Sequence, residues 1–201
     1  MNEVSDEGRS TNPVSRATLL ALAAVATALP TASGAVDTTE LAGASHLNWN
    51  GRLEQRTLDD SSRLNEYTAL TSAVDTAAVS LRIGFLPRFE CTPVMGVRFG
   101  GAMASVPEAF FEDGDVLAVT IDGESVEWPL LVDDGDSGTT LWLDAELSRR
   151  ADIRQRMDVG SRARLALPNT ISIEFSLLGS RRSTAEVESA CLSHEPLPWG
   201  D

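Results

Sequence analysis

The sequence contains no lysine. Its 16 basic residues are all arginine and are outnumbered by 30 acidic residues, which gives a net charge of −14 at pH 7. A protein this acidic repels polyanions, so we do not expect it to bind nucleic acid or an anionic membrane through its overall field. Histidine is scarce as well, because only His46 and His194 occur and no metal-ligand set surrounds either one. Zinc is therefore not expected, and no cofactor is indicated.

Long apolar runs are also missing, with one exception near the start of the chain. Arg16 precedes an apolar run over residues 17–29, which Pro30 and several small residues close. This order is typical of a secretory signal peptide, and the run is shorter than the roughly 20 residues of a transmembrane helix. The alternative is that residues 17–29 form a buried helix of the domain.

The signal-peptide interpretation divides the chain into two parts. Small residues at positions 32–35 predict cleavage before Ala35 or Val36. Residues 1–34 are then an N-terminal extension with a signal peptide, and residues 35–201 are a single acidic, β-rich domain. We expect that domain to lie in the periplasm or to be secreted, without a membrane span.

Cysteine is rare, since only Cys91 and Cys191 are present. In an exported chain they enter an oxidising compartment, where an even count without metal-ligand spacing indicates a bridge first. Cys91 follows a strong strand, and Cys191 shares a helix face with Val187, which should pack toward the sheet. We predict an intramolecular disulfide between Cys91 and Cys191. Two buried free thiols, or a bridge between two chains, are the alternatives.

Along the mature chain, apolar and polar residues mostly alternate with a period of two, and turn residues separate the alternating runs. The clearest run is AVSLRIGFL over residues 78–86, where Val79, Leu81, Ile83 and Phe85 fall on one face. Segments rich in Gly and Asp, such as IDGES and DDGDSG, separate the later runs and supply tight turns. Strands are predicted over residues 46–53, 66–72, 78–86, 94–99, 116–121, 126–132, 139–143, 162–167 and 170–178.

A helical period occurs twice. The first helix, predicted over residues 144–158, has Leu147, Ala151, Ile153 and Met157 within one arc. Arg150 and Arg154 interrupt that arc, so we expect their stems to lie over the sheet while their guanidinium groups reach carboxylates. The second helix follows a turn at residues 179–180 and ends near residue 191, with capping-box spacing over residues 183–186.

The predicted fold is mainly β: an antiparallel β-sandwich or flattened barrel with two short helices, the last one C-terminal.

Five short motifs follow one another along the later part of the chain. They are Leu81-Arg82, Asp122-Gly123 followed by Trp128, Gly160-Ser161-Arg162, Phe175-Ser176-Leu177-Leu178-Gly179, and Ala190-Cys191. This order is similar to that of the VasI family of exported proteins, which are associated with type VI secretion clusters. That family tends to place its first cysteine directly after the Leu-Arg pair, whereas here it comes at Cys91. The resemblance implies an exported protein without generally recognised catalytic residues.

One string is typical of an enzyme. Gly135-Asp136-Ser137-Gly138 resembles the nucleophile loop of chymotrypsin-like serine proteases, and His46 lies upstream, as that order demands. Thr139 replaces the usual third glycine, however, and the residues around His46 differ from the protease pattern. A turn between two strands explains the same letters. We predict that the protein is not an enzyme, and a serine hydrolase using Ser137 is the third hypothesis for its function.

Two charged groups are candidates for binding. Asp133, Asp134 and Asp136 offer oxygens for weak calcium binding, but the EF-hand register is absent and a solvated turn is the favoured interpretation. Arg181 and Arg182 lie at a helix start, where the helix dipole disfavours cations. The arginine pair is therefore a candidate to reach an acidic partner, with plain solvent exposure as the alternative.

The four tryptophans, Trp49, Trp128, Trp142 and Trp199, either pack in the core or line a sugar-binding face. From these observations we expect an exported, non-enzymatic accessory domain that contacts envelope or secreted proteins, associated with type VI secretion as the resemblance implies. The alternative is a ligand-binding β-sandwich for a glycan or for weak calcium binding.

Overall fold

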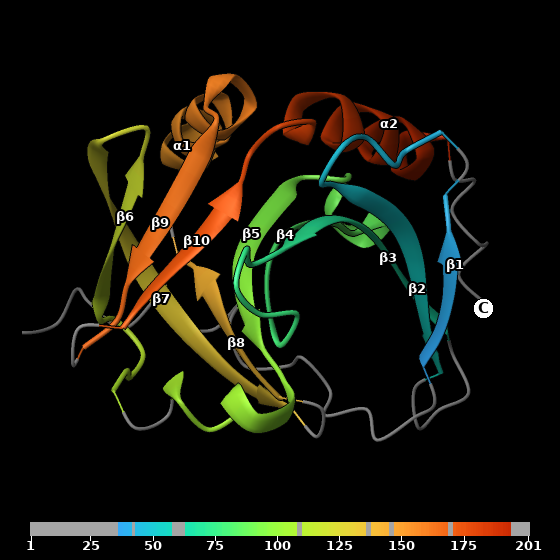
Figure 1. Cartoon of the computed structure of the whole chain (residues 1–201). Coiled ribbons are helices and arrows are strands. Elements are labelled where there is room, and N and C mark those ends of the chain that lie inside the picture. The colour runs from blue at the N-terminus through green and yellow to red at the C-terminus, as the bar shows by residue number, and fades with distance from the viewer. Residues whose placement is uncertain are drawn as a thin grey trace, which may run out of the picture. The chain divides into compact units, whose positions relative to one another are not determined.

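The computed structural model describes residues 36–41, 43–57, 63–107, 110–135, 138–144, 147–168 and 171–193. The chain divides after Thr31 into two units, and all of these residues belong to the second. Within them, ten strands form one antiparallel sheet (Figure 1). The strands are β1 (Val36–Glu40), β2 (Asn50–Thr57), β3 (Arg63–Ser72), β4 (Val79–Phe85), β5 (Pro93–Phe99), β6 (Val116–Ile121), β7 (Glu124–Gly135), β8 (Gly138–Leu143), β9 (Arg162–Ala166) and β10 (Ser172–Ser176). Their order across the sheet is β1-β2-β3-β4-β5-β8-β7-β6-β9-β10.

The predicted fold class is confirmed in its main terms, because the described residues are mainly β with two helices. The sheet is not closed into a barrel, since β1 and β10 form its two ends. It bends instead, so that β10 approaches the end of β3. Ala73 and Phe175 form an isolated bridge there, and the Val74 N–H donates to the Glu174 carbonyl at 2.8 Å. The arrangement is sandwich-like, and the flattened-barrel alternative is wrong.

Asp-Gly turns join neighbouring strands, as the sequence predicts. Between β6 and β7, Ile121 pairs with Glu124, while Asp122 and Gly123 have φ angles of 46° and 94°. Positive φ at both central positions matches the twist of the two strands, which is why Asp-Gly is favoured there. The Asp122 carboxylate also accepts hydrogen bonds from the Ser161 N–H, the Ser161 hydroxyl and the Arg162 N–H, at 2.9, 2.7 and 2.9 Å. These bonds tie the turn to the start of β9.

One face of the central strands forms the core. The β4 residues predicted to share a face are all buried: Val79, Leu81, Ile83 and Phe85. Large aromatic side chains from distant parts of the chain complete this core, among them Trp49, Trp128 and Phe175. Each such side chain contributes about 1.5 to 3 kcal/mol of hydrophobic free energy when it leaves water. The alternating pattern of β4 therefore predicts its core residues correctly.

The helices α1 (Leu147–Val159) and α2 (Ser180–Leu192) lie over the same side of the sheet (Figure 1), and two short 3-10 turns, η1 (Pro87–Phe89) and η2 (Gly101–Met103), complete the elements. Ile153 and Met157 of α1 are buried as predicted, but Ala151 is exposed, because only one narrow stripe of α1 contacts the core. Arg154 fulfils the expectation for its side chain. Its guanidinium donates to Glu188 at 2.6 Å, and its guanidinium carbon lies 5.6 Å from the centre of the Phe85 ring.

The second helix begins earlier than the predicted capping box. Gly179 is the N-cap residue, with a φ angle of 96° and no side-chain cap, and α2 starts at Ser180. Ser183 lies inside the helix, where its hydroxyl donates to the Ala44 carbonyl at 2.6 Å. The capping-box interpretation is wrong because this hydroxyl joins the helix to a neighbouring segment instead of to its own first turn.

The start of the domain differs from the prediction in two ways. No pattern indicated β1, which pairs with β2 from Val36 opposite Arg56 to Glu40 opposite Arg52. The strand predicted over residues 46–53 is instead a tight turn at residues 46–49 followed by β2. The two end residues of that turn bond each other in both directions, at 2.8 and 3.0 Å, so the chain reverses before the strand begins.

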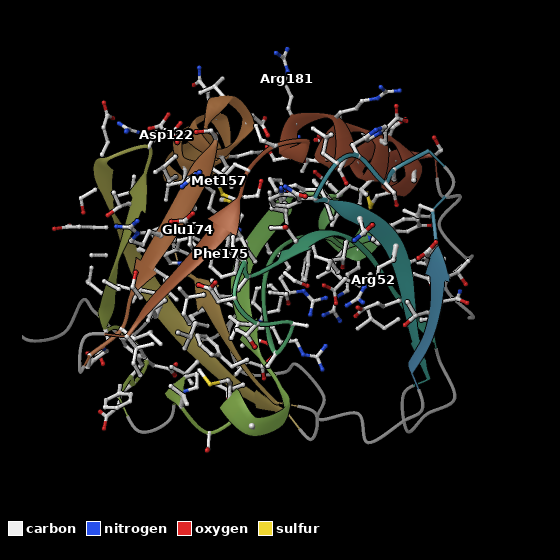
Figure 2. The ribbon with its side chains drawn as sticks, viewed as in Figure 1. Arg52, Asp122, Met157, Glu174, Phe175 and Arg181 are labelled. Carbon is white, nitrogen blue, oxygen red and sulfur yellow. A yellow bond between two sulfur atoms is a disulfide. The ribbon has the colours of Figure 1, made fainter. Side chains whose placement is uncertain are left out.

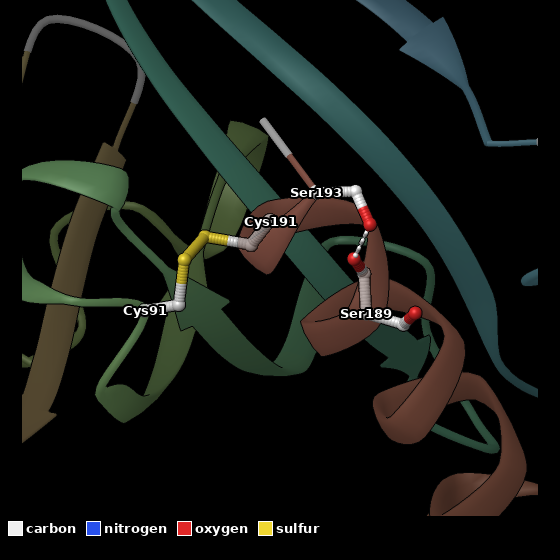
Figure 3. Close-up of a disulfide and its surroundings, with 4 residues drawn as sticks. All are labelled: Cys91, Ser189, Cys191 and Ser193. Carbon is white, nitrogen blue, oxygen red and sulfur yellow. Dashed lines mark hydrogen bonds between the residues drawn. A yellow bond between two sulfur atoms is a disulfide. The ribbon is translucent and has the colours of Figure 1, made fainter. Parts of the chain in front are cut away.

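The predicted disulfide is confirmed. Cys91 follows η1, Cys191 lies in the last turn of α2, and their Cα atoms are 6.0 Å apart (Figure 3). Both residues are buried. The bridge therefore ties the C-terminal helix to the loop between β4 and β5. Among the described residues, the helices are too short or too polar to cross a membrane.

Candidate functional site

A groove lies where the end of α1 meets the start of α2. It has a volume of about 520 Å³ and is lined by residues 158–160, residues 177–182 and Ala185. Gly160 allows these segments to meet, because a Cβ at this position would lie 2.9 Å from the Ile121 side chain and 3.0 Å from that of Leu177. Such distances are closer than normal carbon contacts. The end of α1 therefore approaches the sheet more closely than any residue with a side chain would allow.

Exposed apolar side chains surround this groove. Val159 is 76 % exposed and Leu178 is 51 % exposed, and both line it. Leu47 is 82 % exposed and lies next to Gly179, since a Cβ on Gly179 would be 3.3 Å from the Leu47 Cβ. A single exposed leucine is ordinary, but three apolar residues from three segments around one groove form a patch. We call Leu47, Val159 and Leu178 the apolar patch.

The turn that carries Leu47 is firmly attached to the domain. His46 and Trp49 pair across it, and Leu47 at its tip has a φ angle of 54°. The Asn48 side chain donates to the Ser176 hydroxyl at 2.6 Å, and the Trp49 indole donates to the Ser176 carbonyl at 3.0 Å. Two hydrogen bonds to β10 thus fix the position of the exposed leucine.

Two cations stand beside the apolar patch. Arg181 and Arg182 are exposed residues of the first turn of α2, and Figure 2 shows Arg181 extending outward from the start of that helix. Neither arginine forms an ion pair with another residue in the part of the chain that the structure describes. The predicted interaction pair is therefore exposed and lines the groove.

Asp158 lines the groove, and neighbouring arginines compensate its negative charge only in part. Burial raises the pKa of its carboxyl, against the opposing attraction of Arg154 and Arg181. Arg154 is 3.9 Å away, and the Asp158 Oδ1 atom is buried without a hydrogen-bond partner among the described residues. Asp158 also lines a second hollow of about 460 Å³ next to Cys91 and Glu188. The domain therefore keeps a carboxylate in an unfavourable position between its two helices.

The acidic turn proposed for calcium is only partly described. Asp136 and the side chain of Asp134 lie outside the described part of the chain. Asp133 is exposed, and its carboxylate accepts a hydrogen bond from the Trp142 indole at 3.3 Å. No group of three or more metal-binding side chains comes together elsewhere among the described residues. Weak calcium binding by this turn stays a prediction.

The residues proposed for a serine hydrolase are not placed together. Ser137 lies outside the described residues, as does His194. His46 belongs to the turn beside the apolar patch, where its side chain is half-buried and its Nε2 atom has no hydrogen-bond partner in the described region. The hydrolase hypothesis therefore stays a prediction.

The tryptophans give little support to a sugar-binding face. Trp49 and Trp128 are buried in the core, so neither offers a ring to a ligand. Trp142 is half-buried, and Trp199 lies outside the described residues. The core-packing interpretation is confirmed for the first two.

Sequence reasoning missed a buried network of charges on the other face of the sheet. The Arg82 guanidinium is 2 % exposed and donates to Glu54 and Glu66 at 3.3 and 3.1 Å, and Arg52 forms a further ion pair with Glu54. Attraction to the two carboxylates raises the pKa of Arg82, although burial, the largest single effect, acts in the opposite direction. The only sequence signal was an arginine between apolar residues of a strand. Neither hollow described above is lined by this network.

No family model, no curated protein and no solved structure matches this chain. The arrangement of these residues is therefore the main guide to function.

Proposed function

We propose that this chain is an exported, non-enzymatic accessory domain that binds an envelope or secreted protein through the groove and the apolar patch. One observation carries the proposal: two exposed apolar side chains line one groove and a third lies next to it at Gly179, beside two arginines without ion-pair partners in the described region. Apolar surface of this kind costs free energy in water, and burial against a partner recovers it.

The pattern of polar residues around the patch fits a contact surface. Interfaces between proteins combine a desolvated apolar centre with a polar rim, and arginine is enriched in them. Here the exposed apolar residues Val159 and Leu178 line the same groove as Arg181 and Arg182. The resemblance to exported proteins of type VI secretion clusters suggests that the partner belongs to such a system.

Site-specific photo-crosslinking tests this function in the cell. A photoreactive amino acid replaces Leu178, and the same group at Val116, an exposed apolar residue of β6, is the control. We expect one defined adduct from position 178 with an envelope or secreted protein, identified by mass spectrometry, and no such adduct from position 116. Absence of a specific adduct from positions 47, 159 and 178 would contradict the proposed function. An adduct with a component of type VI secretion would support the narrower assignment, and an adduct with an unrelated envelope protein would overturn it.

A further inference from the structure

Leu47 has a backbone conformation that leucine rarely adopts. Its φ angle of 54° lies in the left-handed region, where glycine, asparagine and aspartate are favoured at the tip of a two-residue turn. Three other non-glycine residues have positive φ: the Asp122 carboxylate accepts three hydrogen bonds, Cys91 forms the disulfide, and Glu90 ends η1 with its N–H donating to the Pro87 carbonyl. Leu47 is 82 % exposed, so its side chain gains almost nothing from the core.

The surroundings of the turn keep this strained leucine in place. Gly179 is part of the arrangement, since a Cβ at this position would lie 2.1 Å from the His46 carbonyl oxygen. The turn therefore packs directly on the backbone that begins α2, and its hydrogen bonds to Ser176 hold it from the other side. A backbone that is already fixed in this way loses little conformational freedom on binding. Leu47 has the properties of a preformed anchor for a partner.

The charges beside Leu47 indicate what kind of partner fits. Arg181 and Arg182 follow two and three residues after Gly179, on a chain with a net charge of −14. A second copy of this chain is disfavoured, because the two copies repel each other and a symmetric contact would bring the arginines together. An anionic membrane would face the whole acidic domain and is disfavoured by the same net charge, whereas a short segment meets only the local charge of the two arginines. A protein segment with carboxylates next to apolar side chains would satisfy both the arginines and the apolar patch.

We infer that Leu47 is the anchor of this surface and that its occupant is an acidic, apolar segment of another protein. This inference rests on the proposed function and adds the chemistry of the partner and the residue on which binding depends. Apolar side chains of the segment pack against Leu47 and Leu178, and its carboxylates bind the guanidinium groups of Arg181 and Arg182.

A peptide-display selection on the purified exported protein tests the inference directly. The probe is a random heptapeptide library. We expect the enriched peptides to combine leucine or aromatic residues with aspartate or glutamate. Failure to enrich any sequence, or enrichment of basic peptides, would contradict the inference. Capture of phosphatidylglycerol vesicles that Leu47→Asn abolishes would also overturn it, in favour of a membrane surface.

Substitutions then separate binding from folding. Asparagine tolerates positive φ, so Leu47→Asn should keep the melting temperature. It should lower the affinity for the enriched peptide by about tenfold or more, as expected for an anchor residue. Leu192→Asn, at the exposed far end of α2, is the matched control and should change neither the melting temperature nor the affinity for the peptide. Arg181→Glu combined with Arg182→Glu should abolish binding, whereas Arg162→Glu on β9 should not. Equal binding by Leu47→Asn and the native protein would overturn the inference.

The cellular crosslink distinguishes the two proposals. If position 178 still forms its specific adduct while Leu47→Asn has no effect on peptide binding, the proposed function stands and the anchor is wrong. If no adduct forms at positions 47, 159 and 178, the proposed function itself fails.

Discussion

Arg82 shows how a single residue controls part of this fold. Its side chain is buried between the carboxylates of Glu54 and Glu66, and Thr68 lies beside it with its hydroxyl 3.4 Å from the guanidinium. Pairing with the arginine offsets part of the cost of removing both carboxylates from water. Space for this pairing comes from Gly84, where a Cβ would lie 2.8 Å from the Glu66 carboxylate.

Replacement of Arg82 should destabilise the domain strongly. Arg82→Met leaves the buried Glu66 without its cation and Glu54 with Arg52 alone, and we expect a loss of about 3 to 5 kcal/mol in the free energy of unfolding. Arg162→Met is the control, because Arg162 pairs with Glu174 at the surface, where an ion pair contributes about 1 kcal/mol or less. Urea unfolding of both variants measures the difference. Similar losses for the two variants would show that the buried network does not stabilise the fold.

Asp122 should make the domain sensitive to acid. The hydroxyl and N–H of Ser161, followed by the N–H of Arg162, hold the pKa of this carboxyl below its ordinary value. A pKa that is lower in the folded state means stability that is present above the unfolded pKa, about 3.9, and lost as pH falls through the folded pKa. Asp122→Asn should therefore lower the melting temperature near pH 7 and flatten its decline below about pH 4. Parallel pH profiles of the two proteins would contradict this assignment.

Asp158 should have the opposite effect. Burial raises the pKa of its carboxyl, so folding penalises the charged form. The penalty is absent below the unfolded pKa and grows as pH rises through the folded pKa. We expect Asp158→Asn to raise the melting temperature at pH 7, and the gain should shrink as pH falls through the folded pKa and vanish below about 4. Calorimetry across this range checks both signs, and a lower melting temperature at pH 7 would show that attraction to Arg154 and Arg181 outweighs burial.

At the scale of elements, the sequence alone predicts the strands whose alternation is decided by the core. β4 is the best example, because Val79, Leu81, Ile83 and Phe85 occupy one face. The alternation of apolar and polar residues carries no information about hydrogen bonds between distant backbone segments. It therefore predicts a strand where the chain reverses at residues 46–49, and it does not indicate β1. The same limit applies to α2, where the capping-box spacing is present but Gly179 and its contact with His46 determine where the helix begins.

The disulfide should make α2 essential to stability. It joins residues 100 apart in sequence, and the chain-entropy treatment of such a loop gives about 4 to 5 kcal/mol as an upper limit. Cys191→Ala should therefore lower the melting temperature markedly, or prevent the protein from accumulating. Ser193→Ala is the control at the end of the same helix, where the hydroxyl only donates to the Ser189 carbonyl (Figure 3). A melting temperature for Cys191→Ala equal to that of the control would contradict this prediction.

At the scale of the whole domain, the candidate site is a product of topology. The site combines the turn at residues 46–49, the end of α1 and the start of α2. More than a hundred residues of sequence separate the turn from the start of α2. β10 brings them together, because Ser176 binds the turn and the chain then passes through Leu178 into α2. Sequence reasoning finds only Arg181 and Arg182, whose charge stands out locally. The apolar patch is invisible to it, since each member looks like an ordinary leucine or valine until the fold places them together.

The division of the chain leads to the last prediction, which concerns export. β1 begins at Val36 and pairs with β2 along its whole length, so cleavage before Ala35 or Val36 leaves this edge strand complete. Cleavage a few residues later would remove hydrogen bonds from the end of the sheet. We therefore expect the exported protein to begin at Ala35 or Val36, as measured by mass spectrometry of the intact chain. Replacement of Ala32, Ser33, Gly34 and Ala35 by bulky residues removes the small side chains before both cuts and should block processing, because signal peptidases require small side chains near the cut. A periplasmic or secreted protein that still begins at Met1 would contradict the signal-peptide interpretation, and the apolar run after Arg16 would then need another explanation.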